Sequence, residues 1–260
     1  MYKGLVLVTA LNERELSTPK RGTSGMRRKY KLRFWYFTKK GAAVLTVALV
    51  GCGTAGAMVL GPLPDPVGAA RETAMRTSLT APARVEFRWI LNEAGSRVDG
   101  LGVVRIEPPA RARLDLFLDN GEGVLSAALV GDELRLPEGA PDDILPPVEL
   151  MWGTLGVFRP MMSAELVGGD ELEGEAHRYR YTSGDGNAIH YEVKHDLVRA
   201  VEMLDGGSVL QSVHLVTVEG DGYPVEATYR NRVEFRELKI TRTSVIPADS
   251  FDPSIWDPRE

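Results

Sequence analysis

Polar and apolar residues alternate through most of the chain beyond residue 83. The segment 84–91 is the clearest example, because Arg84, Glu86 and Arg88 share one face and four apolar side chains share the other. A period of two is typical of a strand with one buried face. The apolar face consists of Val85, Phe87, Trp89 and Leu91. The segment 113–118 has the same pattern, with Leu114, Leu116 and Leu118 on one face.

Similar patterns, separated by Gly- and Asp-rich turns, predict a long antiparallel meander. The remaining predicted strands are 101–106, 124–130, 133–136, 176–182, 189–194, 197–203, 209–218, 225–230 and 232–243. No helix long enough to make neighbouring strands parallel separates them. In the last segment the apolar phase slips, which predicts a bulge near Arg236 and Glu237. Ten or eleven strands are too many for a flat sheet, so we expect a strongly curved one that encloses space.

Two short helices interrupt the strand pattern. The segment 67–79 is a modest amphipathic helix that stops before Pro82. Four prolines between residues 137 and 147 disfavour strand pairing there, and an unusually apolar helix is expected at 148–158. This second helix either caps the open face of the sheet or acts as a ligand lid, and both hold if it plugs a cavity that a ligand later fills.

The sheet and the second helix together define a candidate ligand cavity. Its expected wall is the apolar face of the strands, and its expected closure is the helix that carries Trp152. The candidate cavity residues are Val85, Phe87, Trp89, Leu114, Leu116, Leu118, Trp152, Leu155 and Phe158.

The segment 41–57 predicts export. Ala42–Val50 is nine uncharged residues after Lys39 and Lys40, and nine helical residues reach about half of the ~30 Å hydrocarbon core of a bilayer. The following Leu-Val-Gly-Cys, residues 49–52, resembles the bacterial lipobox. That resemblance implies cleavage before Cys52 and lipidation of its thiol, the most nucleophilic side chain available. The alternative is that Cys52 is a small hydrophobe within a secretory signal.

These features divide the chain into three parts. Residues 1–51 are the expected signal peptide, with Met26 as an alternative start, and residues 52–66 are the lipidated cysteine and a Gly/Pro-rich flexible tether. Residues 67–260 are expected to form one domain. Cys52 is the only cysteine, so a disulfide within one chain is impossible.

The net negative charge of the chain argues against a nucleic-acid partner. The whole chain carries a net charge of −5, and removal of residues 1–51 leaves 20 basic and 34 acidic residues. Such an acidic domain repels phosphate backbones, so we expect no nucleic-acid partner. Attachment to the membrane is expected to come from the acyl chains on Cys52.

Catalytic motifs are mostly absent from the sequence. The chain has no GxSxG and no P-loop, and its histidines, His177, His190, His195 and His214, lack the spacing of a metal pair. The carboxylate pairs Asp142-Asp143 and Asp170-Glu171 are interpreted as solvated loop charge. We therefore expect no enzyme activity, no cofactor and no metal, and an envelope hydrolase is a distant third hypothesis.

The order of these elements resembles the LolA/LolB-like class of outer-membrane lipoproteins. The resemblance extends over most of residues 67–256 and includes the segments 109–116 (PARARLDL), 229–231 (YRN) and 251–256 (FDPSIW). It implies a mainly β fold in which an antiparallel sheet forms an unclosed barrel. It also implies an N-terminal helix and a short apolar helix that stopper a cavity for lipid or lipoprotein acyl chains.

The resulting expectation is a monomeric, non-enzymatic lipoprotein that binds an apolar ligand. Gly53 follows Cys52 in place of the aspartate that retains many lipoproteins at the inner membrane, so the resemblance implies a periplasm-facing position at the outer membrane. The competing hypothesis is a structural or protein-interaction module whose sheet is filled by its own side chains. An open cavity lined by residues such as Phe87, Trp89, Leu116 and Trp152 would distinguish the two.

Overall fold

The computed structural model describes residues 57–259, which fall within one compact unit, Thr54–Glu260. The predicted signal peptide, Cys52 and the first residues of the tether lie outside the described residues. The described part consists of one 13-stranded antiparallel sheet, two α-helices and two 3₁₀ helices. The strands are β1 Val59–Pro62, β2 Ala83–Glu93, β3 Ser96–Glu107, β4 Arg111–Leu118, β5 Gly123–Val130, β6 Glu133–Arg135, β7 Glu165–Leu172, β8 Ala176–Thr182, β9 Ala188–Lys194, β10 Leu197–Asp205, β11 Ser208–Val216, β12 Glu226–Asn231 and β13 Arg236–Pro247. The helices are α1 Pro66–Arg76, η1 Asp142–Ile144, α2 Val148–Thr154 and η2 Pro253–Trp256.

The sheet consists of two meanders joined edge to edge. Its order is β1-β7-β8-β9-β10-β11-β12-β13-β2-β3-β4-β5-β6, so the last strand of the chain pairs with the second. The two ends of the sheet are β1 and β6, which do not pair with each other. The mainly β, antiparallel and unclosed fold class expected from the sequence is therefore confirmed.

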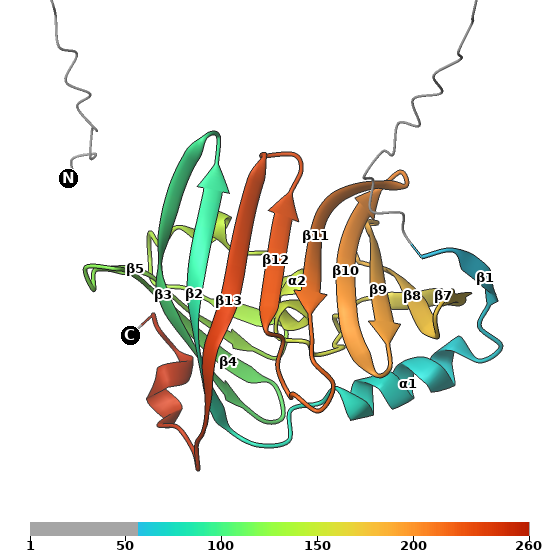
Figure 1. Cartoon of the computed structure of the whole chain (residues 1–260), viewed down its shortest axis with the longest axis horizontal. Coiled ribbons are helices and arrows are strands. Elements are labelled where there is room, and N and C mark those ends of the chain that lie inside the picture. The colour runs from blue at the N-terminus through green and yellow to red at the C-terminus, as the bar shows by residue number, and fades with distance from the viewer. Residues whose placement is uncertain (1–56, 260) are drawn as a thin grey trace, which may run out of the picture. The chain divides into compact units, whose positions relative to one another are not determined.

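The two α-helices lie against different parts of the sheet. Figure 1 shows α2 behind the strands β11 and β12 and α1 beyond the ends of β8 and β9. Asp65 caps α1, because its side chain accepts a hydrogen bond from the backbone of Gly68 at 2.9 Å. The buried residues Ala70 and Thr73 turn one side of α1 toward the core.

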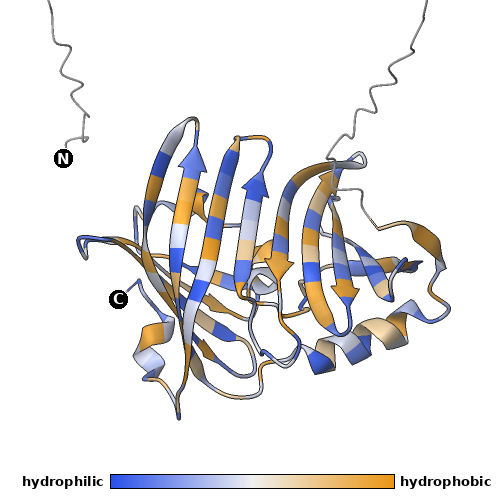
Figure 2. Ribbon diagram, viewed as in Figure 1, coloured by the Kyte–Doolittle hydropathy of each residue, from blue (hydrophilic) through white to orange (hydrophobic). Residues whose placement is uncertain are grey.

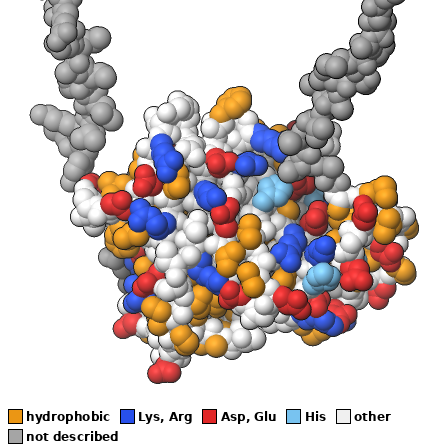
Figure 3. Space-filling view, viewed as in Figure 1, with side chains coloured by type: hydrophobic (Ala, Val, Ile, Leu, Met, Phe, Trp, Pro, Cys, Tyr) orange, Lys and Arg blue, Asp and Glu red, His pale blue; other side chains and the backbone are white. Residues whose placement is uncertain are grey.

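Alternation places the core on the face of the sheet that α2 covers. In β2 every second residue is buried, and Phe87 and Trp89 are 3% and 1% exposed. The bands of opposite hydropathy along the strands in Figure 2 follow this period of two. On the face in view in Figure 3, basic and acidic side chains are interspersed.

Several local predictions were wrong. The segment 59–62 was expected within a flexible tether, but it pairs with β7 as an edge strand. Strand β7 was not predicted, because Gly168 and Gly169 break its alternation. The phase slip near Arg236 is no bulge: residues 232–235 form the β12–β13 turn, where Phe235 is 83% exposed and has a φ of 55°. The register shift of β13 lies further on, between Arg242 and Ser244.

Candidate ligand-binding cavity

An apolar cavity lies between one half of the sheet and the segment that contains α2. Its volume is about 1030 Å³, including space continuous with the solvent. Strands β2, β3, β4, β5, β12 and β13 supply the wall. Six of the nine residues proposed from the sequence line the cavity: Val85, Phe87, Trp89, Leu114, Leu116 and Leu155.

Small residues opposite large ones shape the wall. Gly102 pairs with Phe87 on one side and with Leu116 on the other, and a Cβ at this position would lie 2.3 Å from the Phe87 ring. The absence of a side chain at Gly102 therefore leaves room for the aromatic ring. The indole N–H of Trp89 donates to the carbonyl oxygens of Leu101 and Phe117, at 2.9 and 3.2 Å. Its polar atom is thus satisfied within the sheet, and the remaining surface of the ring is apolar.

Residues 142–158, here called the cover segment, close one side of the cavity. Leu145, Pro146, Met151, Thr154 and Leu155 of this segment line the cavity. The helix α2 packs on β10, β11 and β12. At Gly153 the approach is so close that a Cβ would lie 2.5 Å from a methyl carbon of Val201 in β10. The position of α2 is therefore fixed by contact with the sheet beside the cavity.

The other three predicted residues do not line the cavity. Leu118 is half-buried against the core. Trp152 is buried, its indole N–H donates to the carbonyl of Gly131 at 2.8 Å, and the guanidinium of Arg159 lies 5.9 Å from its ring centroid. Phe158 lies among the tyrosines of β8 and β9. The sequence-based assignment of Trp152 and Phe158 to the cavity was therefore wrong, because Trp152 is held at Gly131 and Phe158 packs against Tyr179 and Tyr191.

Aromatic side chains fill the half of the sheet beside the cavity. The ring of Phe158 lies 5.0 Å from that of Tyr179 and 4.8 Å from that of Tyr191, both with edge-on geometry. The hydroxyl of Tyr191 donates to the carbonyls of Glu149 and Arg159, and that of Tyr179 shares a 2.9 Å hydrogen bond with Thr73 of α1. A smaller cavity of about 210 Å³ remains beside Tyr191. This half of the sheet is filled by the protein's own side chains.

Burial also changes the acidity of these tyrosines. Desolvation raises the pKa of Tyr181 to about 12, with a smaller contribution from Tyr179. It raises the pKa of Tyr191 as well, with the same principal cause. Both phenols are therefore protonated at neutral pH, and that of Tyr191 serves as a hydrogen-bond donor.

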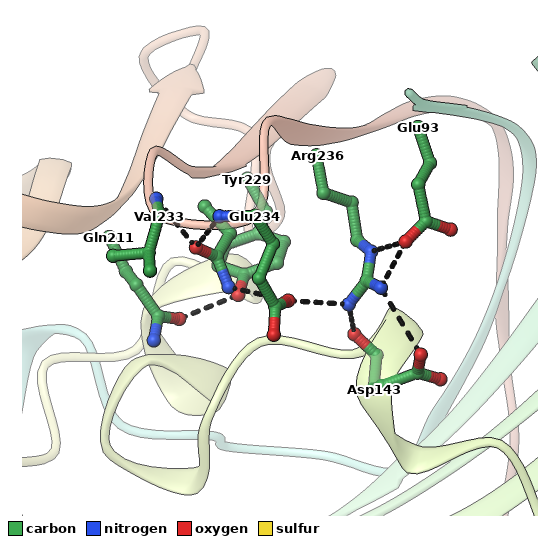
Figure 4. A network of polar contacts seen from close by, with 8 residues as sticks. Glu93, Asp143, Gln211, Tyr229, Val233, Glu234 and Arg236 are labelled. Atoms are coloured by element: carbon green, nitrogen blue, oxygen red, sulfur yellow. Dashed lines mark hydrogen bonds and ion pairs between the residues drawn. The ribbon is translucent and has the colours of Figure 1, made fainter. Parts of the chain in front are cut away.

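A buried arginine holds the first part of the cover segment against the sheet. Arg236, at the start of β13, is 5% exposed and contacts the carboxylates of Glu93, Glu234 and Asp143 (Figure 4). It also donates to the backbone carbonyl of Asp143. The Asp143 carboxylate, expected to be solvated loop charge, thus takes part in an ion pair at 3.1 Å. The sequence alone could not show this cluster, because its members are far apart along the chain.

One part of the cavity wall is polar. Arg242 of β13 lines the cavity beside Tyr223 and Glu226. Its guanidinium contacts both carboxylate oxygens of Asp221 and donates to the carbonyl of Tyr223 at 2.8 Å. These hydrogen bonds hold the pKa of the Asp221 carboxyl below its usual range. Arg242 was not among the residues predicted to line the cavity, although its position in the sequence is in phase with Leu238 and Ile240.

The histidine and carboxylate side chains of the described residues are dispersed. Among residues 57–259, no group of three or more His, Cys, Asp or Glu side chains is placed to hold a metal ion. His177, His190 and His214 lie on separate strands, and His195 contacts Glu175 in a turn. The same range contains no helix of the length and hydropathy that a bilayer span requires.

Comparison with known proteins gives structural neighbours only. No family model and no curated sequence matches the chain. A DUF1329 family protein from Desulfovibrio piger has a TM-score of 0.50 at 12% identity, over 75% of this chain and 98% of that one. A LolA superfamily protein from Nitrosomonas europaea has a TM-score of 0.46 at 9% identity, over 73% and 96%. A domain named for outer membrane lipoprotein sorting, from Vibrio parahaemolyticus, has a TM-score of 0.46 at 10% identity, over 73% and 94%.

Proposed function

We propose that this chain, whose solved neighbours include members of the LolA superfamily, is a cell-envelope lipoprotein that holds an acyl chain in its apolar cavity. The observation that carries the proposal is the open space beside Phe87, Trp89 and Leu116. Ligand pockets are mostly apolar with a few polar groups. The lining of this cavity has such a composition, since Glu226 and Arg242 lie among mostly apolar residues.

The distribution of filled and open space favours a ligand over a purely structural role. The aromatic cluster of Phe158, Tyr179 and Tyr191 fills one half of the sheet, as a structural module requires. The other half keeps small residues, Ala112, Ala127 and Ala227, on its cavity wall. An acyl chain that covers this wall would gain ~0.8 kcal/mol for each buried methylene, so long chains bind and short chains do not.

The membrane anchor is the second part of the proposal. Leu-Val-Gly-Cys at residues 49–52 and the short apolar run before it support lipidation of Cys52. Only six residues separate Cys52 from Val59, the first residue of β1, so an anchored chain would hold the domain close to a bilayer. By the resemblance to the LolA/LolB-like class, we propose residence at the outer membrane, facing the periplasm, without enzyme activity.

A cavity-filling variant tests the binding site. The purified full-length protein is titrated with a fluorescent long-chain fatty acid, which palmitate should displace and octanoate should not. Ala127→Phe places a ring in the cavity and should weaken binding at least tenfold, about 1.4 kcal/mol. Val98→Phe, a matched change at a residue that is 43% exposed, should leave binding unchanged. Equal affinity of the wild type and the Ala127→Phe variant would show that the ligand does not bind in the cavity.

A further inference from the structure

Arg242 is the one arginine among the residues that line the cavity, and its backbone directs it inward. In β13 the even-numbered residues Leu238 and Ile240 face the cavity, and Arg242 continues this series. Its side chain is only 15% exposed. A charged group on an apolar wall is costly to desolvate, so its presence at this position requires a reason.

A bulge ends the inward-facing series directly after this residue. Arg242 is opposite Phe87 of β2, and the register between the two strands shifts between Arg242 and Ser244. Beyond the shift, Val245 pairs with Val85 and the inward phase changes from even to odd positions. Bulges of this kind re-aim side chains at binding sites. Here the bulge makes Arg242 the last inward residue before the phase changes.

The present partners of Arg242 come from one loop. Asp221 and Tyr223 belong to the connection between β11 and β12, and the backbone N–H of Arg242 donates to Val225 of that connection at 3.0 Å. Three of the five N–H groups of the guanidinium donate to Asp221 and Tyr223. The Asp221 side chain is 37% exposed, so it can return to water when another anion replaces it.

We propose that Arg242 receives the head group of the cavity's ligand, and that the ligand is an amphiphile with a long acyl chain and one anionic carboxylate or phosphate head. The inference rests on the proposed function, because it concerns the same cavity. The ligand's anion exchanges with the Asp221 carboxylate, so the guanidinium keeps one anionic partner throughout. Planar guanidinium groups bind carboxylate and phosphate in the same bidentate manner.

The neighbouring acidic residue does not oppose this exchange. Glu226 also lines the cavity, but its carboxylate is paired with Lys239 at 2.7 Å. This local pair is neutral, as is the pair of Arg242 and Asp221. An incoming anion therefore meets no unpaired negative charge from these four residues.

Three probes with the same sixteen-carbon chain, palmitate, hexadecyl phosphate and hexadecanol, separate the contribution of the head group to the affinity from that of the hydrocarbon chain. Isothermal titration of the full-length protein should show both anionic probes binding about tenfold more tightly than hexadecanol. Arg242→Met, which keeps an apolar stem, should remove this preference and leave the affinity for hexadecanol unchanged. Asp221→Asn removes the competing carboxylate. It should raise the affinity for both anionic probes about tenfold and leave the affinity for hexadecanol unchanged.

The outcomes distinguish the two proposals. If hexadecanol binds the wild type and the anionic probes show no preference, the head-group inference is overturned and the cavity remains a binding site. If Arg242→Met loses affinity for all three probes equally, Arg242 has a structural role and the inference is also overturned. If none of the probes binds the wild type, the proposed function itself fails. The stronger of the two anionic probes identifies a carboxylate or a phosphate as the natural head group.

Discussion

Two residues that are close together in the cover segment should have separate effects on stability and on binding. Phe158 is buried in the aromatic cluster and does not line the cavity, whereas Leu155 lines the cavity and is half-buried. We expect Phe158→Ala to reduce the free energy of unfolding with little change in ligand affinity. Leu155→Ala should weaken ligand binding and change the free energy of unfolding much less.

The magnitude for Phe158 follows from its surroundings. Its side chain is 3% exposed and lies between the rings of Tyr179 and Tyr191 at 5.0 and 4.8 Å. Truncation of a buried phenylalanine to alanine costs about 3–5 kcal/mol. Each edge-on aromatic pair contributes about 0.5–1.5 kcal/mol beyond the area buried. With two such pairs, we expect a loss in the upper part of the 3–5 kcal/mol range.

The magnitude for Leu155 is smaller because it borders space that is already open. Truncation there enlarges the cavity without creating a new one, so the loss of stability should not exceed about 2 kcal/mol, the low end for buried leucines. A bound acyl chain would lose contact worth about two methylenes at ~0.8 kcal/mol each. This predicts an affinity about tenfold weaker.

Urea unfolding followed by tryptophan fluorescence measures the first quantity, and titration with a fluorescent long-chain fatty acid measures the second. Val167→Ala, at a side chain that is 56% exposed, is the matched control and should change neither. The reasoning is refuted if Phe158→Ala abolishes binding while the protein stays folded, because Phe158 would then contact the ligand. It is also refuted if Leu155→Ala destabilises the protein as much as Phe158→Ala.

Three further predictions concern the buried arginine, the anchor and the tyrosines. Arg236→Met should lower the free energy of unfolding by about 2 kcal/mol, because Glu93, Glu234 and Asp143 lose their partner but retain access to water; an unchanged urea midpoint would argue against a role for this ion-pair cluster. Cys52→Ala should abolish incorporation of radioactive fatty acid, and retained label would rule out the lipobox interpretation. Stability should fall as pH rises from about 10, where an ordinary tyrosine ionises, to about 12, the raised pKa of Tyr181 in the folded state, because the unfolded chain loses its proton first. Tyr181→Phe should reduce this alkaline loss in unfolding experiments, and an identical pH profile would contradict the assignment.

The sheet was predictable because its alternation is local. Strand β8 was expected at the bounds observed, and the inward faces of β2 and β4 followed from the positions of Phe87 and Leu116. Strand β7 escaped prediction because its Gly168-Gly169 pair has no side chains to alternate. The turn at residues 232–235 was missed because Phe235 is apolar yet points to solvent.

The candidate site was only partly predictable because the neighbours of each residue across the sheet depend on the fold. The wall residues followed from their phase on the strands. The segment predicted as a helix, 148–158, is helical only over Val148–Thr154 and carries apolar residues all round. Its sequence therefore could not show that Leu155 faces the cavity while Trp152 contacts Gly131. The phase of Arg242 was visible in the sequence, but its position opposite Phe87 follows only from the pairing of β13 with β2, which joins the two meanders across more than a hundred residues.

Native mass spectrometry of the protein purified from membranes tests the central claim most directly. If the cavity holds an acyl chain, the wild-type protein should retain a non-covalent lipid in addition to any covalent anchor on Cys52. The Ala127→Phe variant, prepared in parallel, should lack that lipid and keep the anchor. A wild-type mass that the polypeptide and its anchor fully account for, under conditions that preserve added palmitate on a known fatty-acid carrier, would contradict the account.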